Sequence, residues 1–169
     1  GDVTRPRYPA PGLIRSSPAA GSATVTRVTL ALRTERLRVR LLRAADAETL
    51  AAYRSDPQVA RFQSWELPFT ADAAVAMLAP QDAAADVAPG GWTQLAVEEA
   101  GRVVGDVGIN LSADGVVAEI GFTLAPAAHG RGLAREAVAA VVRDLVERRG
   151  VGHVRAETDP ANTASQRVL

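Results

Sequence analysis

The sequence predicts a single α/β domain, and two observations lead to this prediction. Three β-prone runs follow one another over residues 92–98, 103–111 and 116–124, separated by short turns that contain Gly101 and Gly115, which is typical of an antiparallel meander. A long apolar-rich helix pattern over residues 132–149 and a further strand at 153–158 follow the meander directly. A strand, a helix and a second strand therefore form the centre of a predicted α/β sandwich.

The N-terminal part of the chain divides into a tail and a structured region. Residues 1–23 are rich in Pro, Ala and Ser and show no periodicity, so we expect a flexible tail there and one folded domain over residues 24–169. Alternating apolar residues predict strands over 25–32 and 37–41. A helix pattern over 44–62 has Asp46 placed to cap or charge its first turn and a break before Pro57. A second, shorter helix is expected to begin after Thr70, as its N-cap, and to end at Pro80.

The long helix has one broad apolar face and one charged face. Glu136, Arg143 and Glu147 share the charged face, and residues 148–150 end the helix with two cations and a glycine. We expect the apolar face to pack on the sheet, which brings the helix N-terminus to the carboxyl end of strand 116–124, where ligands tend to bind in such sheets. The apolar positions are Leu133, Ala134, Ala137, Val138, Val141, Val142, Leu145 and Val146.

The composition excludes several classes of function. Nineteen basic residues balance nineteen acidic ones, so no net field favours nucleic acid or an anionic membrane, and we expect neither as a partner. The chain has no Lys, which excludes Schiff-base chemistry and a P-loop lysine, and no Cys, which excludes disulfides and thiol nucleophiles. His129 and His153 have no carboxylate cluster beside them, so no metal site is expected. No apolar run approaches a membrane span, and a cytoplasmic location is the default.

The start of the long helix predicts an anion site. Peptide N–H groups at a helix start lack intrahelical partners, and the helix dipole places roughly half a positive charge there. Gly130 and Gly132 remove the Cβ atoms that would keep an anion away, and Arg131 and Arg135 add charged forks suited to phosphate. A phosphate or pyrophosphate is therefore the expected occupant.

Residues 130–135 are also close to a dinucleotide-binding fingerprint, with Glu157 at the end of the next strand as the ribose-binding acid. Against this interpretation, Arg135 stands where the third glycine belongs, residues 126–129 separate strand from loop, and the preceding strands form an antiparallel meander. A dinucleotide-dependent oxidoreductase remains the less favoured alternative.

Four ordered fragments resemble one superfamily of enzymes. His129-x-x-Gly132-x-Ala134 is similar to the acyl-CoA pyrophosphate loop of the GNAT N-acyltransferases, Gln/Arg-x-x-Gly-x-Gly/Ala, although His129 departs from it at the first position. Together with "TERLRVRLL", "AEIGFTLAP" and "DPANTASQRVL", this loop resembles the branch that includes the ribosomal-protein N-terminal (RimJ/RimL-like) acetyltransferases. The resemblance covers about residues 28–169 in the family's order and spacing.

The resemblance implies the GNAT fold, a mixed and mostly antiparallel sheet with helices on both faces, and acetyl-CoA as co-substrate without a metal. Strands 116–124 and 153–158 would splay apart, and the amides of pantetheine would pair with strand backbone in the gap. The implied acetyl-CoA-binding residues are the backbone of Phe122 and Leu124, the loop residues His129, Gly130, Arg131, Gly132, Leu133, Ala134 and Arg135, and the side-chain amide of Asn162, which also suits a helix N-cap.

The implied reaction is direct transfer of an acetyl group from CoA to a primary amine, with no covalent enzyme intermediate. Glu119 and Glu66 are the candidate bases. Many members have a Tyr seven residues after the Asn to protonate the thiolate, and here that position is Leu169, so Ser165 is the remaining candidate hydroxyl.

The sequence leaves the acceptor open between a protein N-terminal α-amine and a small-molecule amine. Trp65 and Trp92 are candidate walls of its pocket, although such residues are more often core. A non-catalytic domain that binds and senses acyl-CoA is the alternative function.

Family members continue past "NTASQRVL" into further strands that cover strand 153–158. We therefore expect a domain truncated at its C-terminus, with those strands missing, whose exposed sheet edge lowers stability or pairs with a second copy in a homodimer.

Overall fold

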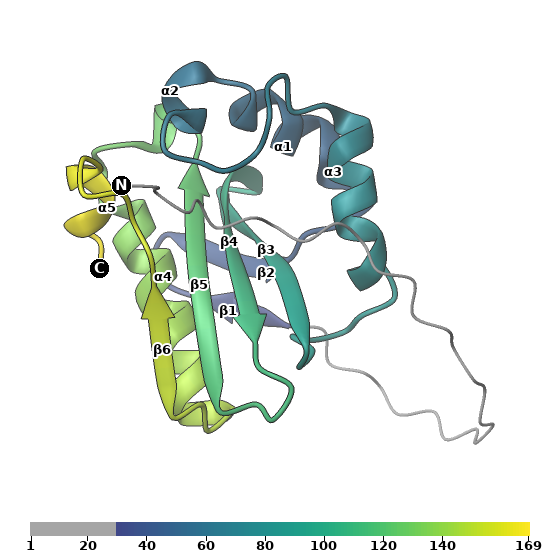
Figure 1. The fold of residues 1–169 in the computed structure, drawn as a ribbon, viewed down its shortest axis with the longest axis vertical. Helices are drawn as coiled ribbons and strands as arrows, with labels where there is room; N and C mark the ends of the chain where they lie inside the picture. Colours follow the sequence, from purple (N-terminus) through teal and green to yellow (C-terminus); the bar gives the residue numbers. More distant parts are fainter. Residues whose placement is uncertain (1–29) are drawn as a thin grey trace, which may run out of the picture.

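The computed structural model describes residues 30–169, which form a six-stranded sheet flanked by helices (Figure 1). The strands follow one another in the sheet in chain order, and all neighbours are antiparallel except β5 and β6, which run parallel. The predicted mixed, mostly antiparallel sheet is confirmed, whereas the predicted tail and residues 25–29 lie outside the described residues. The strands are β1 (Ala31–Arg33), β2 (Leu37–Leu41), β3 (Gly91–Glu99), β4 (Arg102–Leu111), β5 (Val117–Leu124) and β6 (His153–Ala156).

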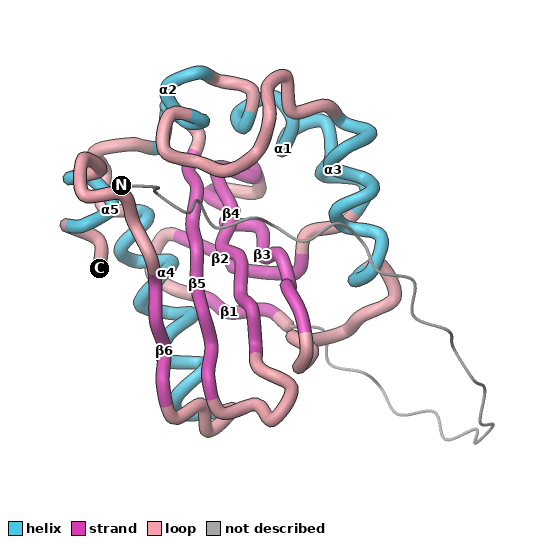
Figure 2. The backbone as a smooth tube through the Cα atoms, in the orientation of Figure 1, coloured by secondary structure: helices cyan, strands magenta, loops and turns pink. Residues whose placement is uncertain are grey.

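Apolar clusters lie on both faces of the sheet and hold different helices. On one face, β2 to β5 pack against the long helix through residues such as Val39, Val107 and Ile120. On the other face, Leu42 and Ala96 belong to a smaller cluster with two N-terminal helices. Figure 2 shows the long helix running along β5 and β6 and the N-terminal helices gathered at one end of the sheet. The helices are α1 (Ala47–Arg54), α2 (Pro57–Ala60), α3 (Ala71–Leu78), α4 (Leu133–Arg143) and α5 (Thr163–Gln166).

The predicted helix over residues 132–149 is α-helical only as far as Arg143. A π-helical turn over Asp144–Arg148 follows, in which the Arg149 N–H donates to Asp144 O at 3.2 Å. The Asp144 carboxylate accepts from the side chains of both Arg148 and Arg149, which stabilises this turn. Val146, expected on the apolar face, is 48% exposed.

Local side chains set the helix starts in the N-terminal layer. Thr70 caps α3, as predicted, by accepting from the Ala73 N–H at 3.1 Å. Pro57 ends α1 as expected but also opens α2, because Asp56 caps this short helix. The 3₁₀ turn Ala44–Asp46 precedes α1.

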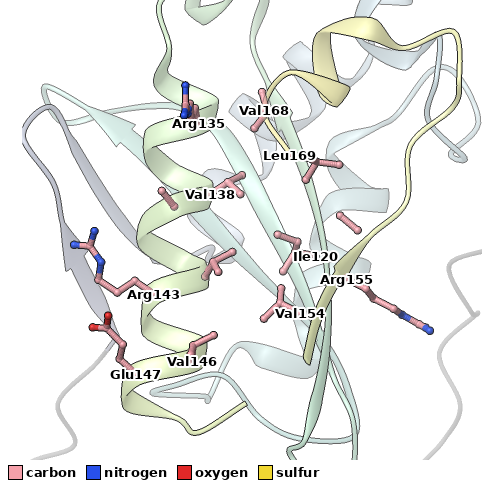
Figure 3. Close-up of a pocket in the computed structure, with 13 residues that line it drawn as sticks. Ile120, Arg135, Val138, Arg143, Val146, Glu147, Val154, Arg155, Val168 and Leu169 are labelled. Carbon is pink, nitrogen blue, oxygen red and sulfur yellow. The ribbon is translucent and has the colours of Figure 1, made fainter. Parts of the chain in front are cut away.

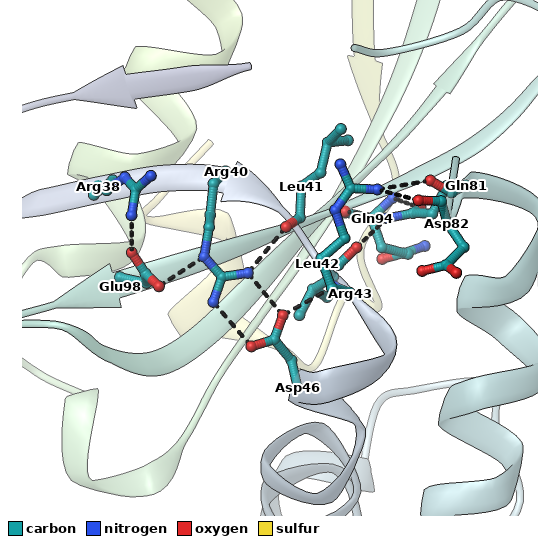
Figure 4. A network of polar contacts seen from close by, with 10 residues as sticks. All are labelled: Arg38, Arg40, Leu41, Leu42, Arg43, Asp46, Gln81, Asp82, Gln94 and Glu98. Atoms are coloured by element: carbon teal, nitrogen blue, oxygen red, sulfur yellow. Dashed lines mark hydrogen bonds and ion pairs between the residues drawn. The ribbon is translucent and has the colours of Figure 1, made fainter. Parts of the chain in front are cut away.

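Asp46 is the N-cap residue of α1, so its charge lies at the helix start as expected, but its side chain makes no capping hydrogen bond to this helix. Its carboxylate accepts from the Arg43 N–H at 2.9 Å and from the Arg40 guanidinium at 2.7 and 2.9 Å (Figure 4). Burial alone would raise the pKa of Asp46, but the hydrogen bonds from Arg40 and Arg43 outweigh it and lower that pKa. The carboxylate therefore joins the turn before α1 to strand β2.

A buried ion pair joins α1 to β4. Arg54 Nη2 lies 2.6 Å from Asp106 Oδ2, and the two side chains are 2% and 3% exposed. The Tyr53 hydroxyl donates to Asp106 Oδ1 at 2.6 Å, and the Arg54 guanidinium stacks on Trp65 at 4.5 Å and on Phe69 at 5.2 Å. Burial and the Asp106 charge raise the pKa of Tyr53, so its hydroxyl remains a donor. This cluster fixes the helical layer on the sheet.

Candidate functional site

β5 and β6 pair over only part of their length. Their register begins with Val117 opposite His153 and ends with Ile120 opposite Ala156. The strand predicted over residues 153–158 stops at Ala156, while β5 continues to Leu124, and Figure 1 shows its tip extending past β6. In the described part of the chain, the last residues of β5 therefore have no strand partner on the β6 side.

The backbone of Phe122 and Leu124 faces this gap. The Ala125 N–H donates to Val104 O next to β5, and hydrogen-bonding groups alternate sides along a strand, so the even-numbered residues direct theirs toward β6. One of these groups already has a partner, because His129 Nε2 lies 2.8 Å from Leu124 O and donates to it. The Leu124 carbonyl keeps a second lone pair. Within residues 30–169, no strand of the sheet pairs with that lone pair, with the Phe122 carbonyl or with the N–H groups of Phe122 and Leu124, so a ligand could pair with them.

The loop before α4 has the backbone of an anion nest. Gly130 and Gly132 have φ of 70° and 75°, in the left-handed region that favours glycine, and Gly132 is the N-cap of α4. Apart from its chain neighbours, no atom of residues 30–169 lies within 4 Å of the position that a Cβ on Gly130 would occupy. Leu133, fully buried in the core, anchors the first turn. Ala134 follows in that turn, and the N–H groups of the turn lie at the positive end of the helix dipole.

The two arginines of this loop differ in their surroundings. Arg131 donates from both terminal nitrogens to the Glu99 carboxylate at the end of β3, at 2.6 and 2.8 Å. This hydrogen-bonded pair lowers the pKa of Glu99. The Arg131 guanidinium was expected to bind a phosphate. In the structure it instead binds a carboxylate of the protein's own sheet. Arg135 is exposed and lines the neighbouring groove.

A groove of about 700 Å³ lies between α4 and β6 (Figure 3). It begins at Ile120 and Ala156, where the strands separate, and at Arg135 on α4. Its walls are mostly apolar, and Val168 after α5 borders its upper end. The groove and the gap are thus continuous. The apolar lining residues include Val138, Ala139, Val142, Val146, Val154 and Leu169.

Of the two candidate bases, Glu119 lies on the sheet. It pairs in register with Asn110 on β4 and Arg155 on β6, and Arg155 Nη2 donates to Glu119 Oε2 at 2.8 Å. Because side chains alternate faces and Ile120 points into the α4 cluster, Glu119 points to the opposite face. Beside it, Gly121 has open space where its Cβ would be. The Glu119 carboxylate therefore lies on the sheet face opposite α4, next to a position without a side chain.

The remaining candidates come from two other segments. Glu66 is exposed in the connection between α2 and α3, which crosses above the tip of β5 in Figure 1. Ser165 and Asn162 lie together at the start of α5, where Asn162 Oδ1 accepts from the Ser165 N–H at 3.1 Å. Trp65 donates to Arg54 O at 3.1 Å and belongs to the helical layer.

Sequence reasoning missed Gln94, which lies on the sheet face opposite α4. It is 2% exposed, and within residues 30–169 neither atom of its amide has a hydrogen-bond partner. A Cβ on Gly108 would lie 3.2 Å from both amide atoms, so only glycine leaves this amide its space. The sequence did contain an indication of this residue, because Gln94 is a polar residue within a strand that is otherwise mostly apolar.

Two further residues that the sequence did not single out for the site, Arg36 and Glu136, lie beside the loop before α4. Nothing in the sequence distinguishes them from ordinary surface charges.

Two kinds of feature are absent from the part of the chain that the structure describes. Across residues 30–169, no three His, Cys, Asp or Glu side chains are grouped so that they could hold a metal ion. None of the helices in this range has the length and apolar character needed to cross a membrane.

The antiparallel order of β3, β4 and β5 excludes the doubly wound parallel sheet that a dinucleotide-binding domain requires. A sheet with one parallel pair that separates beside a glycine-rich helix start defines the class of protein as an acyltransferase domain. The acetyltransferase (GNAT) domain family matches residues 36–169, and the chain belongs to this family of acetyltransferases, whose members bind acetyl-CoA.

Known proteins support this assignment. An uncharacterized N-acetyltransferase, p20, from Bacillus licheniformis is 30% identical over 140 residues, which are 82% of this chain and 78% of that protein. A GNAT-family acetyltransferase from Bacillus anthracis superposes with a TM-score of 0.72 at 23% identity, over 82% of this chain and 80% of its own. Mycobacterium smegmatis RimJ in complex with CoA-disulfide has the same fold, with a TM-score of 0.64 and 21% identity over 79% and 67% of the two chains.

Proposed function

We propose that this protein transfers the acetyl group of acetyl-CoA to a primary amine in a ternary complex. The observation that carries this proposal is the separation of β5 from β6 beyond Ile120 and Ala156, directly beside the glycine nest at the start of α4. The pantetheine amides would pair with Phe122 and Leu124 in the gap, as an added strand does at a sheet edge. The pyrophosphate would lie on the N–H groups of residues 131–134.

The transfer needs positioning and proton movement but no covalent enzyme intermediate. The lone pair of the amine nitrogen attacks the thioester carbonyl carbon, and the tetrahedral intermediate collapses as the C–S bond breaks. The amine gives up one proton, for which Glu119 is the favoured acceptor because its carboxylate borders the open space at Gly121, whereas Glu66 is exposed on a connection. The departing thiolate takes a proton from the Ser165 hydroxyl, which solvent then restores.

The Glu119 carboxylate would act while paired with Arg155. Arg155 Nη2 donates to Glu119 Oε2 at 2.8 Å, and this hydrogen bond would orient the carboxylate. An α-amine with a pKa of about 8 needs less help than a lysine amine above about 10. We therefore favour a protein N-terminal α-amine as acceptor, in line with the RimJ/RimL-like branch that the sequence resembles and with the fold shared with RimJ.

The test is thiol release from acetyl-CoA in the presence of two amine panels, peptides with free N-termini and small-molecule amines. We expect turnover with free-N-terminus peptides and none with the same peptides acetylated at the N-terminus. A Gly132→Asp variant should lose acetyl-CoA binding and activity, because it puts a Cβ and a negative charge where the pyrophosphate approaches.

Binding of acetyl-CoA without thiol release for any amine would instead support the non-catalytic acyl-CoA-binding alternative. Turnover with small-molecule amines alone would reject a protein N-terminus as acceptor but would still support the proposed acetyl transfer to an amine. Unchanged acetyl-CoA affinity in folded Gly132→Asp would reject the loop assignment.

A further inference from the structure

The turn between β1 and β2 touches the loop before α4, although about a hundred residues separate them in sequence. Arg36 Nη1 donates to the backbone carbonyl of Arg131 at 2.9 Å, in the middle of the loop. Arg36 Nη2 lies 3.6 Å from the position of a Cβ on Gly132. A single guanidinium therefore holds the peptide that joins Arg131 to Gly132.

A carboxylate on α4 fixes this guanidinium. Glu136 Oε2 accepts from Arg36 Nε at 2.7 Å and lies 2.6 Å from Arg36 Nη2. Its other oxygen, Oε1, accepts from the Arg36 N–H at 3.0 Å and from the Thr34 hydroxyl at 2.5 Å. Thr34 in turn accepts from the Leu37 N–H at 2.9 Å. Because these polar groups converge on one carboxylate, the guanidinium has little freedom to turn.

The charges of this arrangement bear on an anion in the loop. Glu136 is in the first turn of α4, where its negative charge would oppose a bound pyrophosphate. Arg36 neutralises this charge, while Arg131 is itself neutralised by Glu99. The N–H groups of the nest thus keep their net attraction for an anion only while Arg36 is in place.

We propose that Arg36 is a positioning residue for the acetyl donor: together with Glu136, it holds the Gly130–Gly132 loop in the conformation that receives the pyrophosphate. This inference rests on the proposed acetyl-CoA site and deepens it. It assigns a role to the "TER" segment of the sequence, residues 34–36, which forms the turn between β1 and β2 rather than part of the β5–β6 gap. The role predicts that Arg36 acts on the pyrophosphate end of the donor alone.

The experiment compares two donors that differ in this end. Acetyl-CoA carries the pyrophosphate, whereas S-acetylpantetheine presents the same thioester without it. The variants are Arg36→Ala, Arg36→Lys and the matched control Arg38→Ala. Arg38 is the next arginine along the chain, similarly exposed (46% against 42% for Arg36), and paired with Glu98 rather than with the loop. The measurements are the calorimetric Kd for CoA, and kcat and KM for each donor.

For Arg36→Ala we expect a rise of about tenfold or more in the Kd for CoA and in the KM for acetyl-CoA, since a charge-assisted hydrogen bond and a neutralising charge are lost. The kcat at saturating acetyl-CoA should stay within about twofold, because the reacting atoms are untouched. With S-acetylpantetheine, Arg36→Ala and wild type should have equal kcat/KM. Arg36→Lys should be intermediate, because an ammonium retains the charge but not the planar fork.

An equal loss with both donors would mean that Arg36 supports the fold in general, and it would overturn the inference. An Arg36→Ala variant that behaves like Arg38→Ala in every measurement would overturn it as well. If Arg36→Ala does not fold, Arg36→Lys and Glu136→Gln, each of which removes part of the arrangement, must still weaken acetyl-CoA selectively. A wild-type protein that binds no CoA would reject the proposed function itself, which separates that failure from a failure of this inference alone.

Discussion

Asp106→Asn should destabilise the protein strongly. Asparagine has nearly the shape of aspartate, so the substitution leaves the packing between α1 and β4 in place and removes only the charge. The guanidinium of Arg54, 2% exposed and 2.6 Å from Asp106 Oδ2, then loses the counter-charge of Asp106. Its stacking on Trp65 and Phe69 does not replace that charge, because a ring face attracts a cation more weakly than a carboxylate does.

Removing one partner of a buried ion pair costs about 3–5 kcal/mol, because the remaining charge stays desolvated. For a domain of this size, about 3 kcal/mol corresponds to a fall in Tm of about 10 °C. Urea unfolding followed by circular dichroism gives the free energy of unfolding, and a thermal scan gives Tm. The matched control is Arg148→Gln. Arg148 is 55% exposed, and its partner Asp144, 8% exposed, keeps its ion pair with Arg149, so this variant should cost less than about 1 kcal/mol.

A loss in Asp106→Asn no larger than that of Arg148→Gln would refute this reasoning. A second variant separates charge from packing: Arg54→Met combined with Asp106→Leu removes both charges and should recover much of the lost stability, since well-packed apolar pairs often replace buried ion pairs. If the double variant is as unstable as Asp106→Asn, packing rather than the unpaired charge governs this position.

Three further outcomes follow from the structure. Gly105→Ala should cost more than about 2 kcal/mol in urea unfolding, because its Cβ would lie 2.4 Å from Thr123 O, and backbone cannot yield as a side chain does; a neutral result would mean that the β4–β5 spacing is different. Ser165→Ala should lower kcat for thiol release more than it weakens CoA binding, and equal losses would remove this hydroxyl from the mechanism. Hydrogen bonds from Thr34 and from the Arg36 N–H lower the pKa of Glu136 below its ordinary 4.5. A lowered pKa stabilises the ionised form above pH 4.5, so CoA affinity should hold there and fall as the pH drops through the lowered pKa; a Glu136→Gln variant with the same pH profile would contradict this.

The fold was predictable where local pattern and tertiary packing agree. Strands β3, β4 and β5 are β-prone runs separated by glycine turns, and the structure has them within one residue of the prediction at each end. Thr70 was recognisable as an N-cap because its hydroxyl acts within three residues.

Features that depend on the geometry of the folded chain were not predictable. Asp46 stands at the N-cap position of α1, but its carboxylate pairs with Arg40, because the turn after β2 brings these two side chains together. Val146 fits the apolar stripe of α4, yet the π-helical turn and the absence of covering residues in the described chain leave it exposed.

The candidate site divides in the same way. Gly130 and Gly132 were identifiable because positive φ and close anion approach both require glycine. The engagement of Arg131 by Glu99, and of its carbonyl by Arg36, was hidden because the partners come from β3 and from the turn before β2. The sequence marks which residue types a phosphate needs, but only the fold decides which of their charges are already neutralised.

Every cation in the ion pairs named for this protein is an arginine, and the sequence contains no lysine. A guanidinium stays protonated at any working pH, whereas a lysine ammonium, with a pKa of about 10.4, is deprotonated often enough to react with a thioester. The side chains of this acetyltransferase therefore offer the activated acetyl group no amine of their own. When an isotopically labelled acetyl donor is used, labelled acetyl-lysine must therefore belong to an added substrate. Acetylation of lysine side chains of the enzyme does not contribute to the measured signal.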